Sequence, residues 1–133
     1  MTTLPTRSLP ARLVAAGAFL GWLLATPATH AGDVTAGKNV FKSECAECHS
    51  VKEGTNKKGP SLFGIVGRKA GSVAGFAYSD AMLQSGRTWN AEALHGYLSQ
   101  PAKQALPGTK MKYDGLDHAK DLDDLLSYLA TLK

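Results

Sequence analysis

Two thiols and an imidazole stand within five residues of one another in this chain, in the segment Cys45-Ala46-Glu47-Cys48-His49. Thiols three positions apart can each add to a vinyl group of one porphyrin, and the imidazole that follows can then reach its iron as an axial ligand. This spacing is typical of covalent haem attachment. The chain has no other cysteine. The pattern therefore predicts one covalently attached haem c, bound through Cys45 and Cys48, with His49 on the iron.

Three other chemistries use close cysteines: a disulfide, a redox-active dithiol and half of a zinc site. An oxidising compartment would allow the disulfide. A zinc site needs further Cys or His ligands in pattern. A thiol oxidoreductase needs a strand and a helix around the pair, whereas the flanking residues here predict a short helix and a glycine-rich loop. The haem interpretation is favoured over all three.

A haem iron held by His49 needs a sixth ligand or keeps an open position, and this choice separates an electron carrier from a catalyst or sensor. Met111 lies in a turn-rich loop, Pro107-Gly108-Thr109-Lys110-Met111, and its thioether is a soft ligand that suits ferrous iron. A single methionine is more often core packing, and this is the simplest interpretation of Met82 on a short predicted helix. His95 and His118 are most simply exposed helix residues.

The first 31 residues have the features of a secretory signal. Arg7 and Arg12 give a positive start, Leu13 to Ala25 is an uncharged apolar run, and Thr29-His30-Ala31 is a small-x-small cleavage site. The run is shorter than the roughly 20 residues that cross a bilayer. We expect cleavage after Ala31, an uncleaved membrane anchor being the alternative. Residues 32–133 would then form one domain in a periplasm, without a membrane span.

The basic character of the whole chain depends largely on this segment. Its formal charge is +4, but without Arg7 and Arg12 thirteen Lys and Arg face eleven Asp and Glu, which leaves +2. Two ionised haem propionates would cancel that charge. The composition therefore gives no argument for nucleic-acid binding, and we expect none.

The remaining pattern predicts an all-α domain. Asp33 caps a helix that runs to about Cys45, and residues 50–75 are so rich in glycine that they predict consecutive turns without a strand. Short helices are expected over 79–85, ended by Gly86, and over 91–99, capped by Asn90 and stopped by Pro101. A loop follows to about residue 116. The last helix shows helical leucine spacing, with acidic residues at its start: Leu122, Leu125, Leu126, Leu129, Leu132; Asp117, Asp121, Asp123, Asp124.

Several spaced motifs occur together in one order, and with them residues 32–133 resemble a class I cytochrome c of the small, soluble, mitochondrial-like type. The resemblance implies four to five helices and loops wrapped around one covalently bound haem. It extends over the haem motif and the following segments: Ala36-Gly37, Phe41, Gly59-Pro60-Ser61-Leu62, Gly67-Arg68-Lys69, Gly75-Phe76-Ala77-Tyr78-Ser79, Trp89, Tyr97-Leu98, Pro107-Gly108-Thr109-Lys110-Met111 and residues 125–129.

The resemblance also implies roles for individual residues. Met111 would be the sixth ligand of the iron, and the Pro60 carbonyl would accept the second ring N–H of His49, which orients the ligand. Tyr97 would present its hydroxyl to the sulfur of Met111. The propionates need donors when they are buried, and these would come from five side chains: Tyr78 and Trp89 at one propionate, Ser79 and Thr109 near the other, and Arg68 as a positive charge.

Such a protein would carry single electrons and catalyse no reaction. Its iron would cycle between Fe(II) and Fe(III), taking electrons from a membrane complex or periplasmic dehydrogenase and passing them to a terminal acceptor, as in a respiratory chain. We expect a monomer that docks transiently with redox partners, steered by Lys57, Lys103 and Lys110. The alternatives are a haem subunit tethered to the membrane, or a peroxidase or gas sensor if Met111 leaves the iron.

Overall fold

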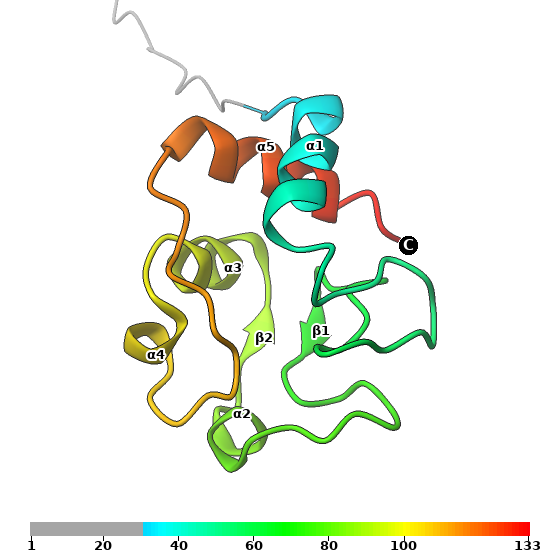
Figure 1. The fold of residues 1–133 in the computed structure, drawn as a ribbon, viewed down its shortest axis with the longest axis vertical. Helices are drawn as coiled ribbons and strands as arrows, with labels where there is room; N and C mark the ends of the chain where they lie inside the picture. Colours follow the sequence, from blue (N-terminus) through cyan, green and yellow to red (C-terminus); the bar gives the residue numbers. More distant parts are fainter. Residues whose placement is uncertain (1–30) are drawn as a thin grey trace, which may run out of the picture.

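The computed structural model describes residues 31–133, so the predicted signal segment lies outside the described residues apart from Ala31. The described part forms five helices and one pair of very short strands (Figure 1). Their order and bounds are α1 (Val34–Glu44), β1 (Arg68–Lys69), α2 (Asp80–Gln84), β2 (Thr88–Trp89), α3 (Ala91–Leu98), α4 (Ala102–Ala105) and α5 (Ala119–Leu129). The predicted helical class is confirmed.

The first and last helices cross and form the largest contact between elements (Figure 1). A Cβ on Gly37 would collide with the carbonyl oxygen of Asp124 in α5, so only glycine allows the two backbones to come this close. One turn further along α1, the rings of Phe41 and Tyr128 lie 5.7 Å apart. Leu125 is completely buried beside them. Gly37, Phe41, Leu125 and Tyr128 thus form the packed contact between the first and last helices.

A buried carboxylate joins the start of α1 to α5. Asp33 caps α1 by accepting from the backbone N–H groups of Thr35 and Ala36, at 2.7 and 2.9 Å. Its own N–H donates to Asp124 Oδ1 at 2.7 Å, and Lys120 Nζ donates to Asp124 Oδ2 at 2.6 Å. The bond from Lys120, and then the one from Asp33, lower the pKa of Asp124. Asp124 is thus ionised although its side chain is almost entirely buried.

The helix α3 begins at the predicted cap Asn90, and α2 begins one residue after its predicted start, with Ser79 as its cap. Ser79 Oγ accepts from Met82 N at 3.2 Å at the start of α2, and Asn90 Oδ1 accepts from Ala93 N at 2.8 Å at the start of α3. The prediction of a loop directly after Pro101 is wrong, because residues 102–105 form the single turn α4. Proline fixes its own φ near the helical value and needs no N–H there, so it can begin a helix as readily as it ends the previous one.

The prediction of no strand is also wrong, although the sheet consists of only two residue pairs. Arg68 pairs with Trp89 and Lys69 with Thr88, in antiparallel register. Two residues are too few to show a period of two in sequence. The pairing ties the glycine-rich loop to the start of α3. The loop itself turns at five glycines with positive φ: Gly54, Gly64, Gly67, Gly71 and Gly75.

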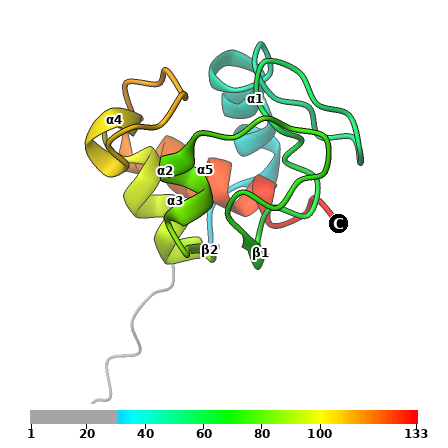
Figure 2. The same cartoon turned by 90° about the horizontal axis from the view of Figure 1, so that it is seen from below.

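The glycine-rich loop lies on one side of the molecule, and α3 and α4 lie on the other (Figures 1 and 2). The last helix, α5, lies at the top of the view in Figure 1, where it crosses α1. Within residues 31–133, no helix combines the length and the apolar character that a membrane crossing requires.

Candidate haem-binding site

A cavity of about 300 Å³ opens between these two sides of the fold. Its volume lies within the range of roughly 300 to 1,000 Å³ that is usual for ligand sites. The walls come from α1, the glycine-rich loop, α2, α3 and the loop before α5. The structure brings all eleven residues predicted from the sequence to these walls: Cys45, Cys48, His49, Pro60, Arg68, Tyr78, Ser79, Trp89, Tyr97, Thr109 and Met111.

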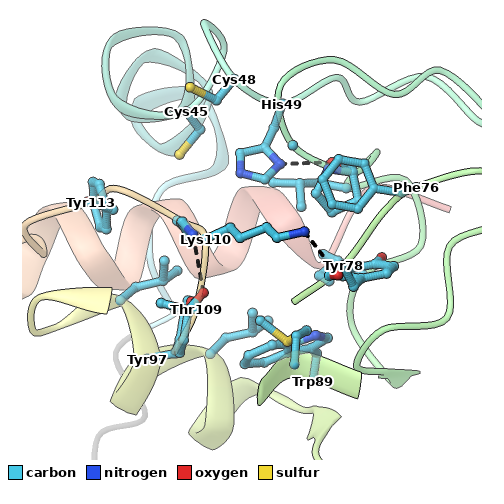
Figure 3. Close-up of a pocket in the computed structure, with 18 of the residues that line it drawn as sticks. Cys45, Cys48, His49, Phe76, Tyr78, Trp89, Tyr97, Thr109, Lys110 and Tyr113 are labelled. Carbon is cyan, nitrogen blue, oxygen red and sulfur yellow. Dashed lines mark hydrogen bonds between the residues drawn. The ribbon is translucent and has the colours of Figure 1, made fainter. Parts of the chain in front are cut away.

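The two thiols and the imidazole are presented by a turn at the end of α1. Cys48 N and His49 N both donate to the carbonyl oxygen of Cys45, at 3.1 and 2.8 Å, which folds the motif back on itself. Figure 3 shows Cys45, Cys48 and His49 together at one wall of the cavity. The thiols are not joined in a disulfide. Burial raises the pKa of the Cys45 thiol to about 12.

His49 is oriented by one strong hydrogen bond. Its Nδ1 lies 2.8 Å from the carbonyl oxygen of Pro60. Because a carbonyl oxygen only accepts, Nδ1 carries the proton and donates, which leaves the lone pair on Nε2. Burial is the main reason why the pKa of His49 is lowered, so the ring is neutral, as a metal ligand must be.

The ring of His49 lies directly against Gly59. A Cβ at this position would lie 2.7 Å from Nδ1 and 2.9 Å from Nε2, closer than such atoms come in proteins. Gly59 N in turn donates to Cys48 O at 2.8 Å, so the loop is bound to the haem motif itself. Gly59 therefore leaves the space that the imidazole occupies, and the hydrogen bond to Pro60 orients the ring.

The loop that carries Met111 is held by a second set of bonds. Thr109 Oγ1 accepts from Met111 N at 3.2 Å and lies 3.2 Å from the hydroxyl of Tyr97. The hydroxyl of Tyr97 is thus paired with that of Thr109, which lies between the tyrosine and the backbone of the ligand loop. A bond from Tyr97 to the sulfur of Met111 stays a prediction.

The remaining predicted residues differ in what they can still offer to a bound group. Ser79 Oγ accepts from Met82 N, so its O–H remains free to donate. Tyr78 Oη likewise accepts from Val73 N, at 3.3 Å. Arg68 already donates to the carbonyls of Phe63 and Ser61, at 2.7 and 2.9 Å. It therefore contributes its positive charge and braces the loop.

Two further residues at the cavity, Phe76 and Tyr113, were given no role by the sequence, and Lys110 was predicted only to steer docking. Phe76 meets Tyr78 edge to face, with ring centroids 4.8 Å apart. Lys110 extends across the cavity and donates from Nζ to Tyr78 O at 3.3 Å (Figure 3). Tyr113 lies beside Cys45, and burial raises its pKa to about 12. The one sequence signal that could have pointed to Tyr113 is that it is aromatic and lies two positions after Met111.

This set of groups fits a covalently bound porphyrin. Two thiols and a neutral imidazole share one wall, and the rest of the lining is largely aliphatic and aromatic and includes several hydroxyl groups. A zinc site would need more ligands, and residues 31–133 contain no cluster of three His, Cys, Asp or Glu side chains that could hold a metal ion. The haem interpretation therefore agrees with the geometry, and the zinc alternative does not.

The family model, the sequence relatives and the solved structure all indicate the same family. Residues 34–133 match the family model described as cytochrome c. A cytochrome c of Gibberella zeae is 52% identical over 99 residues, which span 74% of this chain and 92% of the relative. A cytochrome c of Arabidopsis thaliana is 50% identical over 99 residues, 74% of this chain and 88% of that one.

A solved structure agrees with the sequence relatives. Cytochrome cH from Methylobacterium extorquens is similar with a TM-score of 0.69 and 42% identity, over 75% of this chain and 99% of that chain. Members of this family hold haem c through two cysteines and carry electrons rather than catalyse reactions, and the two cysteines of this chain, Cys45 and Cys48, are consistent with that attachment. The chain belongs to the cytochrome c family.

Proposed function

We propose that this protein is a one-electron carrier of the periplasm whose haem iron is held by His49 and Met111, and which docks transiently with redox proteins as a monomer. The observation that carries the proposal is the single cavity that both residues line, with the two thiols beside His49. Bound haem supplies a one-electron Fe(II)/Fe(III) couple. The chain's own residues orient the ligands and exclude water.

The ligand pair determines the function. With the thioether of Met111 and the imidazole of His49 as its ligands, the iron would have no open position for oxygen or peroxide, and its ferrous state would be favoured more than with two imidazole ligands. Thr109 supports this arrangement because it fixes the backbone N–H of Met111 and is itself bonded to the buried Tyr97. His49 is fixed independently by Pro60. Both ligands are thus held by the protein.

The ligand assignment is tested by Met111→Ala in the holoprotein. We expect the near-infrared sulfur-to-iron charge-transfer band to disappear, carbon monoxide to bind the ferrous form readily, and the reduction potential to fall. Met82→Leu is the matched control, because Met82 is the other methionine at the cavity wall and its removal leaves the band in place. A parent protein without the band, or a band lost only in the Met82 variant, would contradict the assignment. Ready binding of carbon monoxide by the parent would instead favour a catalyst or sensor.

Polar side chains of the cavity would hold the haem propionates. We propose that Tyr78, Trp89, Ser79 and Thr109 donate to them and that Arg68 supplies charge. Support comes from the free O–H of Ser79 and from the half-buried guanidinium of Arg68, which is braced by two carbonyls. A crystal structure of the holoprotein tests each of these contacts directly.

The periplasmic location rests on the N-terminal sequence. A positive start, an apolar run and the Thr29-His30-Ala31 segment support export and cleavage, after which Gly32 would be the first residue. The mass of the protein recovered from the periplasmic fraction tests this. A mass that includes residues 1–31, in the membrane fraction, would instead show a tethered haem subunit.

Exposed lysines would guide partner docking. Lys57, Lys103 and Lys110 are exposed, and Lys110 lines the cavity and extends across it (Figure 3). Charges at the rim of such a contact raise the rate of association and make it depend on salt. We expect reduction of the ferric protein by a physiological partner to slow as ionic strength rises, and to be slower in Lys110→Gln. Rates independent of salt would contradict this docking surface.

A further inference from the structure

Tyr113 has the one buried side-chain polar atom in residues 31–133 that lacks a hydrogen-bond partner. A hydroxyl taken out of water without a partner is costly, and native proteins leave few such groups. The other tyrosine hydroxyls at the cavity are paired, that of Tyr97 with Thr109 and that of Tyr78 with Val73 N. The unpaired state of Tyr113 is therefore specific to this residue.

The position of Tyr113 is fixed by its backbone. Its carbonyl oxygen accepts from Ala102 N at 2.8 Å, and Ala102 is completely buried at the start of α4. Three residues later, Leu116 N donates to Leu98 O at 2.8 Å, which binds the same loop to α3. The ring packs against the hydrophobic core and lines the cavity near Cys45 (Figure 3). The hydroxyl is therefore held at the cavity wall by the fold.

We propose that the Tyr113 hydroxyl donates a hydrogen bond inside the filled cavity, to a polar atom of the haem or to a water retained beside it, and so fastens the Met111 loop. Tyr113 lies two residues after Met111 in the same loop. A bond made there restrains the loop segment that must move when the thioether leaves the iron. Tyr113 is thus a positioning residue for the ligand, and this inference rests on the proposed ligation by Met111.

The test is Tyr113→Phe in the holoprotein, with imidazole as the probe. Imidazole binds the ferric iron only after it displaces Met111, so its affinity measures how firmly the loop is held. Loss of one hydrogen bond should raise that affinity about two- to tenfold. If the hydroxyl has no partner in the holoprotein, the substitution removes an unpaired polar group, and imidazole affinity will be unchanged or lower. That result would overturn the proposal.

Tyr128→Phe is the matched control, because Tyr128 loses the same atom at the contact of α1 with α5, away from the cavity. Its imidazole affinity should equal that of the parent. An equal increase in both variants would show general destabilisation and overturn the proposal.

A double-mutant cycle separates this proposal from the ligand assignment. In a Met111→Ala background there is no thioether to displace, so Tyr113→Phe should leave imidazole affinity unchanged. The same increase in both backgrounds would overturn the role of Tyr113. If instead the parent binds imidazole as tightly as Met111→Ala, the ligation by Met111 fails. A holoprotein crystal structure identifies the acceptor as haem or water, and a hydroxyl with no polar atom within about 3.2 Å would contradict the bond.

Discussion

His49 shows how one residue of the site depends on two neighbours that carry no reactive group. Pro60 lacks an N–H and offers only its carbonyl, which forces the proton onto Nδ1 and leaves the lone pair of Nε2 free for the iron ligation proposed here. Gly59 has no Cβ, and the imidazole occupies the volume that one would fill. The protonation of the imidazole therefore depends on the missing N–H of Pro60, and its position depends on the missing Cβ of Gly59.

Gly59→Ala tests the second of these conditions. The added methyl would contact the ring of His49, so either the ring or the loop must move. We expect a loss of about 1 to 3 kcal/mol in the free energy of unfolding, as for other overpacked sites, and weaker binding of His49 to the iron. Denaturant unfolding and the iron–imidazole stretching frequency measure the two effects.

Gly96→Ala is the control for this substitution. Gly96 lies inside α3 with nothing within 4 Å of a Cβ. Alanine should stabilise that helix by roughly 0.5 to 1 kcal/mol. A Gly59→Ala protein as stable as the parent, with an unchanged stretching frequency, would show that the close contact does not matter.

At the scale of elements, α1 and α5 contact each other through a glycine and through the capping residue of α1. Gly37 lets α1 approach the backbone of α5, and Phe41 then packs on Tyr128. The same approach brings the N–H of Asp33 to Asp124. One glycine therefore determines both an apolar contact and a polar one, and the two depend on each other.

Gly37→Ala should separate the helices. Its Cβ would collide with Asp124 O and lie 2.9 Å from Tyr128 Cβ, and neither backbone can yield without moving its helix. We expect a loss of at least about 2 kcal/mol in the free energy of unfolding, in the upper part of the range for overpacking. Urea denaturation measures it, with Gly96→Ala again as reference. A value near that of Gly96→Ala would show that the crossing tolerates a side chain.

The elements also show what sequence could predict. The helices with polar caps were predicted within one residue at their starts, because Asp33 and Asn90 carry a local signal. The strand pair and α4 were missed, because two to four residues have no period and depend on tertiary contacts. For the site, the spacing of the two thiols and the imidazole is a local feature, and it was sufficient to predict the haem cofactor. The pairing of Tyr97 with Thr109, and the unpaired hydroxyl of Tyr113, exist only once the chain is folded.

At the scale of the whole molecule, one buried charge links its acid stability to the contact of α1 with α5. The pKa of Asp124 is lowered by Lys120 and Asp33, so its contribution is fully present above the unfolded value of about 4. It is lost as the pH falls through the folded value. Glu47 is also shifted, by Lys58, but this pair is exposed and contributes little.

We therefore expect the part of the urea midpoint that depends on Asp124, measured as the difference between the parent and Asp124→Asn, to be constant from pH 7 down to about pH 5 and to fall below about pH 4. Asp124→Asn should unfold at lower urea at pH 7 and should lose less on acidification, because the amide keeps an acceptor for Asp33 but has no charge. Asp114→Asn, at an exposed position, is the control and should retain the parent's profile. Identical acid profiles for Asp124→Asn and the parent would exclude Asp124 as the cause.

The crossing of the first helix with the last has a consequence for the order of events during synthesis. The thiols lie at the end of α1, but α5, which packs against α1, is completed only at Leu129. A chain emerging from its N-terminus cannot make this contact until α5 has been synthesised. Cys45 and Cys48 therefore stay accessible until then, which leaves time for the proposed haem attachment before the fold closes around them.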